Sequence, residues 1–198
     1  MVFNNRLKCN VTLQYGREID EYDRSESPVY VVVPDGDRRV IGSLRVLPTT
    51  DPTMLKNSFR VMFQGDVDIE CATAWECTRF CVHPSENKHV TAKSIALELL
   101  LGLCDLALAS GMDTIIGVCV AAMERVYQRL GWSPIPLQKP YPEVGFINCG
   151  IWEVSPKVSN TLENNLKKID GTTSGFTFPN SRKHKGFKKS HKCIIIKK

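Results

Sequence analysis

The sequence predicts an α/β fold in which helices cover a mixed β-sheet. Two observations carry this prediction. The first half of the chain reads as strands joined by turns, and the second half alternates helical and strand patterns of apolar residues. Such an order is typical of a mixed sheet that is covered on both faces. At 198 residues, the chain is long enough to bury the core of a single domain.

The first half supplies three strands. Residues 28–33 (PVYVVV) are rich in β-branched and aromatic side chains, which favour a strand. Residues 35–37 (DGD) predict a turn, and residues 39–47 predict its hairpin partner. Residues 54–63 have the pattern of a short amphipathic segment, and residues 74–82 predict the third strand.

The second half alternates helices and strands. Residues 91–110 carry apolar side chains at helical spacing, and Gly111 is placed to end that helix. Residues 114–120 predict a buried strand, and residues 121–130 predict a second helix. Residues 145–154 predict the last strand of the sheet.

The net charge of +5 is unevenly distributed. Residues 181–198 contain eight lysines and arginines and no acidic residue, so the rest of the chain carries −3. We expect residues 1–156 to form one domain and residues 157–198 to form a basic, disordered tail. Basic tails can bind nucleic acid. This one has no aromatic residue beyond Phe187 and no recognition motif, so we do not expect nucleic-acid binding.

The eight cysteines show neither a disulfide nor a metal-binding pattern. Several lie inside apolar segments, where free cysteine behaves as a small hydrophobic residue. The chain has no C-x-x-C pair, and its four histidines lack the spacing of a zinc site. No segment approaches the ~20 apolar residues that span a bilayer, and the first residues do not resemble a signal peptide. We therefore expect a cytoplasmic protein with reduced thiols, no metal and no membrane association.

Three charged clusters stand beside large apolar residues in segments that otherwise read as sheet or sheet edge. Charges on a half-buried scaffold usually meet a charged ligand, although each cluster alone is also consistent with structural ion pairs. Together they predict a site. Its ionisable members are Glu18, Asp20, Asp23, Arg45, Glu76 and Arg79.

The order and spacing of these clusters resemble the acyl-homoserine-lactone synthases, which make the signals of bacterial quorum sensing. The resemblance rests on an E-x-D-x-x-D element at 18–23, R-V-L-P-T at 45–49, a Met-Leu pair before Phe59, and W-E-C-T-R-F at 75–80. Met123-Glu124-Arg125 and a Leu-Gly-Trp further on extend it to about residue 154. It implies a three-layer α/β/α sandwich akin to the GNAT acetyltransferases.

The resemblance also implies a reaction. Such synthases join the α-amino group of S-adenosylmethionine to an acyl thioester on a carrier protein, and then close a lactone as methylthioadenosine leaves. S-adenosylmethionine is a substrate here, and we expect neither another cofactor nor an oligomer. The alternatives are an inactive, truncated synthase and a GNAT-type N-acyltransferase that uses acyl-CoA. The acyl-CoA alternative usually needs a glycine-rich turn for the pyrophosphate, but residues 83–89 contain no glycine.

The chemistry suggests a role for each cluster. Asp20 and Asp23, together with Glu76, are expected to hold the cationic centres, and Arg45 and Arg79 are expected to pair with carboxylates. Glu76 is the expected base for the amine, and backbone N–H groups near Thr78 are expected to stabilise the tetrahedral intermediate. The remaining candidate substrate-binding residues are Phe3, Glu18, Phe59, Trp75, Phe80, Cys119, Met123 and Phe146.

The second half of the chain is expected to line the acyl pocket. The candidates are Leu100, Leu103, Val118, Met123, Val126 and Phe146. The thiol of Cys119 is a weak hydrogen-bond donor where family members that make 3-oxo products often carry a hydroxyl, which disfavours a 3-oxo chain. A basic face could dock an acidic carrier protein, and it is equally consistent with solvation. Its members are Lys88, Lys93, Arg125, Arg129 and Lys139.

Two details of the sequence lead to further expectations. Side chains alternate along a strand, so Glu76 and Arg79 would point to opposite faces of a regular strand, and we expect a bulge that realigns them. The family also has an N-terminal helix whose arginine would precede Met1, and a tryptophan where this chain has Cys9. We expect these departures to leave the adenosylmethionine site more open to water.

Overall fold

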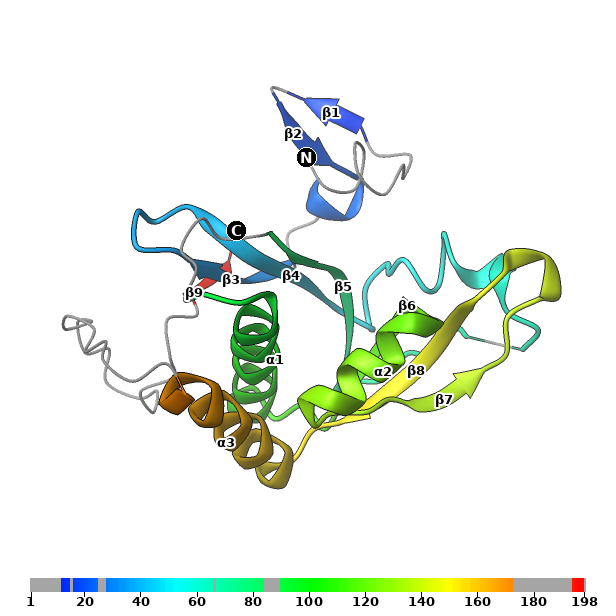
Figure 1. Ribbon diagram of the computed structural model, residues 1–198. Coiled ribbons are helices and arrows are strands. Elements are labelled where there is room, and N and C mark those ends of the chain that lie inside the picture. The colour runs from blue at the N-terminus through cyan, green and yellow to red at the C-terminus, as the bar shows by residue number, and fades with distance from the viewer. Residues whose placement is uncertain are drawn as a thin grey trace.

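The computed structural model describes residues 12–14, 16–24, 28–65, 67–83, 90–172 and 194–197. They form a seven-stranded mixed sheet in the order β7-β8-β6-β5-β4-β3-β9 and a separate two-stranded hairpin, β1–β2 (Figure 1). The strands are β1 (Thr12–Gln14), β2 (Arg17–Ile19), β3 (Val29–Pro34), β4 (Val40–Pro48), β5 (Ala74–Val82), β6 (Thr114–Val120), β7 (Ile135–Gln138), β8 (Ile147–Glu153) and β9 (Ile194–Lys197). The predicted mixed-sheet α/β fold is therefore confirmed.

Three α-helices and three short 3-10 turns complete the described elements. They are α1 (Ala92–Ala109), α2 (Ala121–Leu130), α3 (Pro156–Thr172), η1 (Tyr22–Arg24), η2 (Arg60–Met62) and η3 (Pro142–Val144). A capping box between Thr91 and Ser94 starts α1. After its end, Gly111 adopts a φ of +74°, which glycine allows at little cost. Helix α1 thus lies where the sequence predicts it.

The main core lies between the sheet and the helices. In Figure 1, α1 and α3 lie on one side of the sheet and the β1–β2 hairpin lies on the other. Side chains from α1, α2 and α3 all pack into this core, for example Leu99, Tyr127 and Leu162. The other face carries a smaller core beneath residues 49–73, which include Leu55 and Phe63. Among the described residues, this second layer is an irregular segment rather than a helical one.

The domain extends further along the chain than expected. Residues 156–172, which the sequence analysis assigned to a disordered tail, form α3. Leu162 and Leu166 of this helix are buried, and Ser159 donates a hydrogen bond of 2.6 Å to Asp105 on α1. The prediction of disorder is wrong for this stretch because apolar residues four positions apart form a face that packs on α1. Residues 173–193 lie outside the described part.

Other differences from the sequence analysis are local. Residues 54–63, expected to be a short amphipathic segment, form turns and the short η2, and the four-residue β7 was not predicted. Strand β9 pairs antiparallel with the outer edge of β3. Within the described ranges, no helix is long and apolar enough to cross a membrane, and no cluster of three His, Cys, Asp or Glu residues is placed to hold a metal.

Candidate active site

The site forms where two neighbouring parallel strands separate. Strands β5 and β6 pair over only three positions, from Ala74–Thr114 to Glu76–Ile116. Beyond Glu76, β5 continues along β4, and β6 continues along β8. Beyond this point, β5 and β6 no longer pair with each other. Space opens between the two strands.

The predicted bulge is present in β5. Arg45 of β4 lies opposite Thr78, whereas Ser43 lies opposite Cys81, so β5 has one extra residue in this interval. Arg79 sits in the interval with a φ of +52°, a left-handed conformation that costs a non-glycine residue about 1–3 kcal/mol. The bulge lies at Arg79 itself and turns this side chain toward Asp20.

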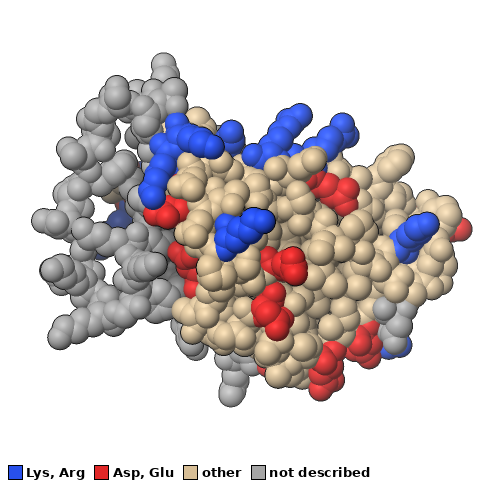
Figure 2. All heavy atoms as spheres, turned by 90° about the horizontal axis from the view of Figure 1, so that it is seen from below, with Lys and Arg blue, Asp and Glu red and all other residues tan. Residues whose placement is uncertain are grey.

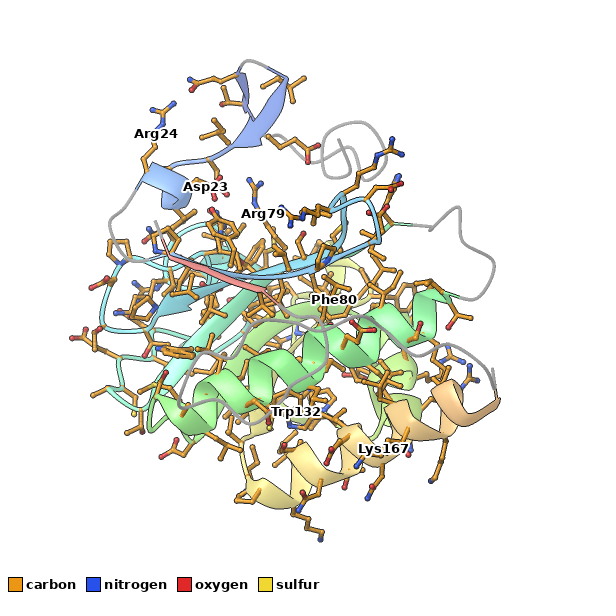
Figure 3. The ribbon with its side chains drawn as sticks, turned by 90° about the vertical axis from the view of Figure 1, so that its left-hand side faces the viewer. Asp23, Arg24, Arg79, Phe80, Trp132 and Lys167 are labelled. Atoms are coloured by element: carbon orange, nitrogen blue, oxygen red, sulfur yellow. The ribbon has the colours of Figure 1, made fainter. Side chains whose placement is uncertain are left out.

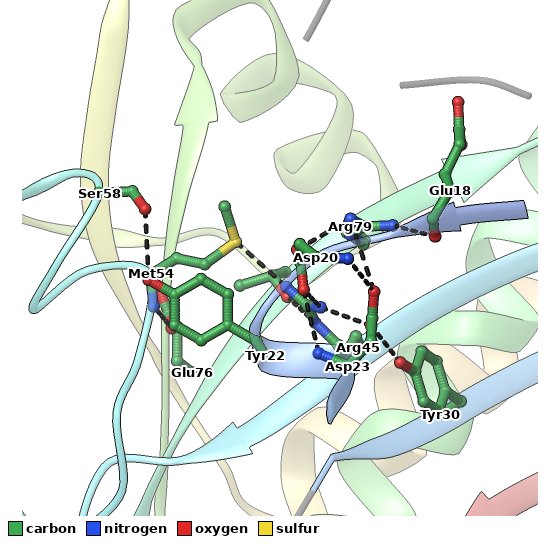
Figure 4. A network of polar contacts seen from close by, with 11 residues as sticks. Glu18, Asp20, Tyr22, Asp23, Tyr30, Arg45, Met54, Ser58, Glu76 and Arg79 are labelled. Carbon is green, nitrogen blue, oxygen red and sulfur yellow. Dashed lines mark hydrogen bonds and ion pairs between the residues drawn. The ribbon is translucent and has the colours of Figure 1, made fainter. Parts of the chain in front are cut away.

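A charged network covers this face of the sheet (Figure 4). Nη1 of Arg45 donates to Oδ1 of Asp20 at 2.7 Å and to Oδ1 of Asp23 at 2.6 Å. Nη2 of Arg79 donates to Oδ2 of Asp20 at 2.8 Å and lies 3.7 Å from Oδ2 of Asp23. Two guanidinium groups from the sheet are therefore paired with two carboxylates from the segment after β2.

Hydrogen bonds between backbone N–H groups and side-chain carboxylates hold the segment from Asp20 to Asp23 in place. The N–H of Asp20 donates to Asp23 at 2.8 Å, and the N–H of Asp23 donates to Asp20 at 3.0 Å. The hydroxyl of Tyr30, from β3, donates to Asp23. The i, i+3 spacing in the sequence makes this reciprocal bonding possible. The segment thus presents both carboxylates to the two arginines with little freedom.

Arg45 is fully buried, and each of the three nitrogen atoms of its guanidinium contacts another side chain. Besides the two aspartates, its Nε donates to the hydroxyl of Thr78 at 3.0 Å, and its Nη2 contacts the sulfur of Met54 at 3.2 Å. Its guanidinium also lies 5.5 Å from the centre of the Tyr22 ring, in cation–π geometry. A buried cation with this many partners fixes the positions of its neighbours.

The network shifts the pKa values of its members. Burial opposes the ionisation of Asp20, but the hydrogen bond and charge of Arg45 and the charge of Arg79 outweigh it and lower the Asp20 pKa to about 2. Burial, together with the hydrogen bond to Asp23, raises the pKa of Tyr30 to about 12. At neutral pH, Asp20 is therefore an anion and Tyr30 a neutral donor.

Glu76 lies below the network, on the same face of β5 as Thr78. It is 1% exposed, and its two carboxylate oxygens accept backbone N–H groups of Met54 and Leu55, each at 2.8 Å. Burial raises its pKa to about 7, although these hydrogen bonds and the charge of Arg45 oppose the rise. Glu76 is thus a carboxylate that can accept a proton near neutral pH.

A cavity of about 60 Å³, lined mostly by apolar and aromatic residues, lies on the other side of the separated strands. This is several times the space that one water needs. In Figure 3, Asp23 and Arg79 lie on one side of the sheet and Trp132 on the other. The cavity is lined by Cys77, Thr78, Arg79, Phe80, Leu100, Leu103, Ile115, Gly117, Val118, Tyr127, Trp132 and Trp152. Arg79 and Phe80 therefore belong to its wall, and Arg79 also belongs to the charged network.

Several predicted site residues lie in or beside this arrangement. Thr78 and Phe80 line the cavity, as do Leu100, Leu103 and Val118. Glu18 takes part through its backbone carbonyl, which accepts from Arg79 at 3.2 Å, while its carboxylate points away in Figure 4.

The structure places two other predicted residues away from the network and the cavity. Trp75 packs against the main core, on the opposite face of β5 from Glu76. Phe59 packs in the smaller core beneath residues 49–73, and Phe3 lies outside the described residues.

The cavity wall differs in part from the set of residues predicted to line the acyl pocket. Phe146 is 88% exposed and precedes β8, and its neighbour Ile147 is the one that packs inward. Cys119, Met123 and Val126 pack at the margin of the main core rather than in the cavity wall.

Sequence reasoning missed three aromatic residues of the wall, Tyr127, Trp132 and Trp152. Tyr127 follows Met123 by four residues, so helical spacing was the signal that could have found it. Trp132 belongs to the Leu-Gly-Trp element that supports the family resemblance. Nothing in that element predicts a cavity. Trp152 lies on β8. The sequence analysis predicted that this segment is a strand, but not that it lines a cavity.

Comparison with known proteins gives consistent results. The family model "Autoinducer synthase" matches residues 1–148. An acyl-homoserine-lactone synthase of Rhizobium etli is 45% identical, and the match covers 85% of this chain and 79% of the relative. A synthase of Rhizobium radiobacter is 33% identical over 70% of this chain and 66% of its own.

Solved structures agree. The CoA-dependent acyl-homoserine lactone synthase MesI superposes with a TM-score of 0.67 at 26% identity, covering 80% of this chain and 78% of MesI. The AHL synthase LasI gives a TM-score of 0.70 at 25% identity, covering 82% of each chain.

Proposed function

This chain belongs to the autoinducer synthase family and is an acyltransferase of the acyl-homoserine-lactone synthase type, and we propose that it couples S-adenosylmethionine to an acyl thioester. One observation carries the proposal. At the bulge at Arg79, a network of both charge signs and a mostly apolar cavity meet at the same point of β5. The charged network matches an amino-acid head group, and the cavity matches an acyl chain.

The methionyl part of S-adenosylmethionine carries an ammonium, a sulfonium and a carboxylate. Asp20 and Asp23 are partly exposed anions next to the site and supply the negative charge. Arg79 is partly exposed, so its guanidinium can meet the substrate carboxylate. Arg45 is fully buried and already contacts Asp20, Asp23, Thr78 and Met54, so we assign it to holding the carboxylates in place.

The first chemical step needs a neutral amine. An α-amino group has a pKa near ~8, and Glu76, with its raised pKa of about 7, can accept its proton directly or through a water. The amine then attacks the thioester carbon. Backbone N–H groups of β5 near Thr78, where the ladder to β6 has ended, stabilise the oxyanion. The thiol of the donor leaves and the amide bond remains.

The second step closes the ring. A carboxylate oxygen of the methionyl group attacks the γ-carbon, the bond from that carbon to the sulfonium breaks, and neutral methylthioadenosine leaves. The whole reaction converts S-adenosylmethionine and an acyl thioester to an acyl-homoserine lactone, methylthioadenosine, a free thiol and one proton. No cysteine nucleophile is required. Burial raises the pKa of the Cys77 thiol, in the cavity wall, to about 12, so it is protonated at neutral pH.

We propose an acyl-carrier protein as the donor, with acyl-CoA as the alternative. Carrier proteins are acidic, and Figure 2 shows Lys and Arg side chains gathered along one edge of the face that carries the helices. Lys93, Arg125, Arg129 and Lys139 are exposed, and Lys88 lies outside the described residues. MesI is CoA-dependent, so the donor is best decided by comparing both thioesters of the same acyl chain.

The test uses the purified full chain with S-adenosylmethionine and either donor. Mass spectrometry follows the lactone and methylthioadenosine, and a thiol reagent follows the first step. Equal amounts of lactone, methylthioadenosine and thiol are expected. Thiol release without methylthioadenosine would mean that the chain is an N-acyltransferase that does not form the lactone. Absence of all three products with both donors would contradict the proposal.

A further inference from the structure

Tyr30 is a neutral member of the charged network, and the proposed chemistry gives it no task. It lies on β3 directly opposite Arg45 of β4, so both side chains point to the face that carries the network. Its hydroxyl donates to Oδ1 of Asp23, the same oxygen that Nη1 of Arg45 contacts. Burial and this hydrogen bond raise the pKa of Tyr30 to about 12. Tyr30 therefore adds a hydrogen bond to Asp23 without adding a charge.

The sheet holds the backbone of Tyr30 from both sides. Strand β3 pairs antiparallel with β4 along one edge and with β9 along the other. In these two ladders, Tyr30 lies opposite Arg45 on one side and opposite Ile196 on the other. A residue with a paired strand on each side has little backbone freedom. The hydroxyl of Tyr30 thus reaches Asp23 from a fixed base.

Asp23 has no position left for a substrate. Its Oδ1 accepts from Tyr30 and from Arg45, the latter at 2.6 Å. Its Oδ2 accepts the N–H of Asp20 at 2.8 Å and lies 3.7 Å from Nη2 of Arg79. A carboxylate has about four positions at which it accepts hydrogen bonds. The groups around Asp23 occupy all of them.

Asp20 differs in this respect. Its Oδ1 accepts from Arg45 at 2.7 Å and from the N–H of Asp23 at 3.0 Å. Within the described ranges, its Oδ2 accepts only from Arg79, at 2.8 Å. The Asp20 side chain is also more exposed than that of Asp23, at 18% against 12%. One oxygen of Asp20 therefore keeps a position for an N–H group of a ligand, and this oxygen lies beside Arg79.

We propose that Tyr30 is a positioning residue for S-adenosylmethionine and that it acts through Asp23. Its hydroxyl holds Asp23 against Arg45. Asp20 is then the carboxylate that accepts from the substrate amine, and Arg79 stays available for the substrate carboxylate. This inference rests on the proposed function.

The geometry around Asp23 explains why the hydroxyl matters. In Figure 4, Tyr30 and Arg79 lie on opposite sides of Asp23, and they contact different carboxylate oxygens. Without the hydroxyl, Asp23 can turn and pair with Arg79 more closely than the present 3.7 Å. Asp23 would then compete with the substrate carboxylate for this guanidinium.

The test measures kcat and the KM of each substrate with the purified full chain. Tyr30→Phe keeps the ring and removes the hydroxyl. The KM for S-adenosylmethionine is expected to rise about tenfold, while kcat and the KM for the acyl thioester change by less than about twofold. A general loss of folded structure would not separate the two KM values in this way. Tyr141→Phe, at an exposed tyrosine outside the network, is the matched control and should leave both unchanged.

A double-mutant cycle decides whether Tyr30 acts through Asp23. In an Asp23→Asn background, Tyr30→Phe should change the KM for S-adenosylmethionine by less than about twofold, because the anion that Tyr30 positions is gone. An equal rise in both backgrounds would mean that Tyr30 contacts the substrate directly and would overturn the inference. An unchanged KM in Tyr30→Phe alone would overturn it as well.

A second comparison leaves Tyr30 intact and still decides if Tyr30→Phe fails to fold. Asp20→Asn should raise the KM for S-adenosylmethionine at least about tenfold more than Asp23→Asn, since only Asp20 accepts from the substrate. Equal or reversed effects would overturn the inference and leave the synthase function intact. A wild type that forms no lactone with either donor would contradict the proposed function, and this inference with it.

Discussion

The guanidinium of Arg45, fully buried in the sheet, holds one carboxylate oxygen of Asp20 at 2.7 Å. This leaves the other oxygen of Asp20 to Arg79, at 2.8 Å. One carboxylate thus joins a buried arginine, which fixes the geometry, to a more accessible arginine beside the cavity. The charged network is therefore built before any substrate binds, which reduces the reorganisation that the reaction requires.

Replacing Arg45 by methionine should destabilise the fold strongly. Arg45→Met fills a similar volume but leaves Asp20 and Asp23 close together without the buried cation. We expect the free energy of unfolding to fall by about 3–5 kcal/mol, measured by urea denaturation at pH 7. Arg39→Met, at an exposed arginine at the end of the neighbouring turn, should change it by less than about 0.5 kcal/mol. Equal effects of the two substitutions would argue against a structural role for Arg45.

Glu76→Gln should abolish base catalysis. The glutamine keeps the shape of the side chain but cannot take the proton, so kcat/KM should fall by about 10²–10⁴. Glu70→Gln, at an exposed glutamate paired with Lys56, is the control and should retain activity. In the wild type, kcat/KM should rise about tenfold per pH unit up to about pH 7, where Glu76 ionises, and then level off. A pH profile that is flat between pH 5 and 8 would exclude Glu76 as the base.

The raised pKa of Glu76 also predicts how stability depends on pH. Between about pH 4.5 and 7 the folded state keeps a proton on Glu76 that the unfolded state releases, so stability falls as pH rises through this window. Relative to Glu76→Gln, the wild type should lose on the order of 3 kcal/mol between these limits. Urea denaturation of both proteins at pH 4.5, 6 and 7.5 measures the difference. A constant difference would mean that the pKa of Glu76 is ordinary.

Arg79→Gly should separate the backbone role of this position from its charge. Glycine accepts the left-handed conformation without strain, and this gain offsets the lost ion pair with Asp20, so stability should change by less than about 1 kcal/mol. The KM for S-adenosylmethionine should rise at least about tenfold, because the carboxylate partner is gone. Arg38→Gly is the matched control, since Arg38 also has a positive φ but lies in an exposed turn. It should leave this KM unchanged.

Helix α3 should behave as part of the domain. Leu166→Ala removes a buried side chain and is expected to lower the free energy of unfolding by about 2–5 kcal/mol. Asn164→Ala, on the exposed side of the same helix, should change it by less than about 0.5 kcal/mol. A neutral Leu166→Ala would instead support the disordered tail that the sequence suggested.

Local patterns were sufficient for much of the fold. Residues 74–82, 114–120 and 121–130 form the elements that their apolar periodicity predicts, with the same limits. Alternation along a strand also predicted the bulge, because Glu76 and Arg79 had to be realigned. These inferences needed only neighbours in sequence, which is where strand and helix geometry act.

The remaining features depend on contacts between distant segments. The polar composition of residues 156–172 hid a helix whose stability comes from packing Leu162 and Leu166 against α1. Phe146 was assigned to the acyl wall, but it lies just before β8 and is exposed. The cavity itself arises because β5 and β6 stop pairing after Glu76, and no local pattern encodes where two parallel strands separate.

The pairing of β9 with β3 has a consequence for the order of events during synthesis. Residues 29–32 find their outer partner in residues 194–197, ~160 residues later in the chain. At about 5–20 residues per second, the ribosome needs roughly 8–30 seconds to deliver that partner. Until then the outer edge of β3, a run of valines, offers its backbone to any other nascent chain. The time between the two segments is therefore a window for aggregation, and chaperone dependence should be greatest there.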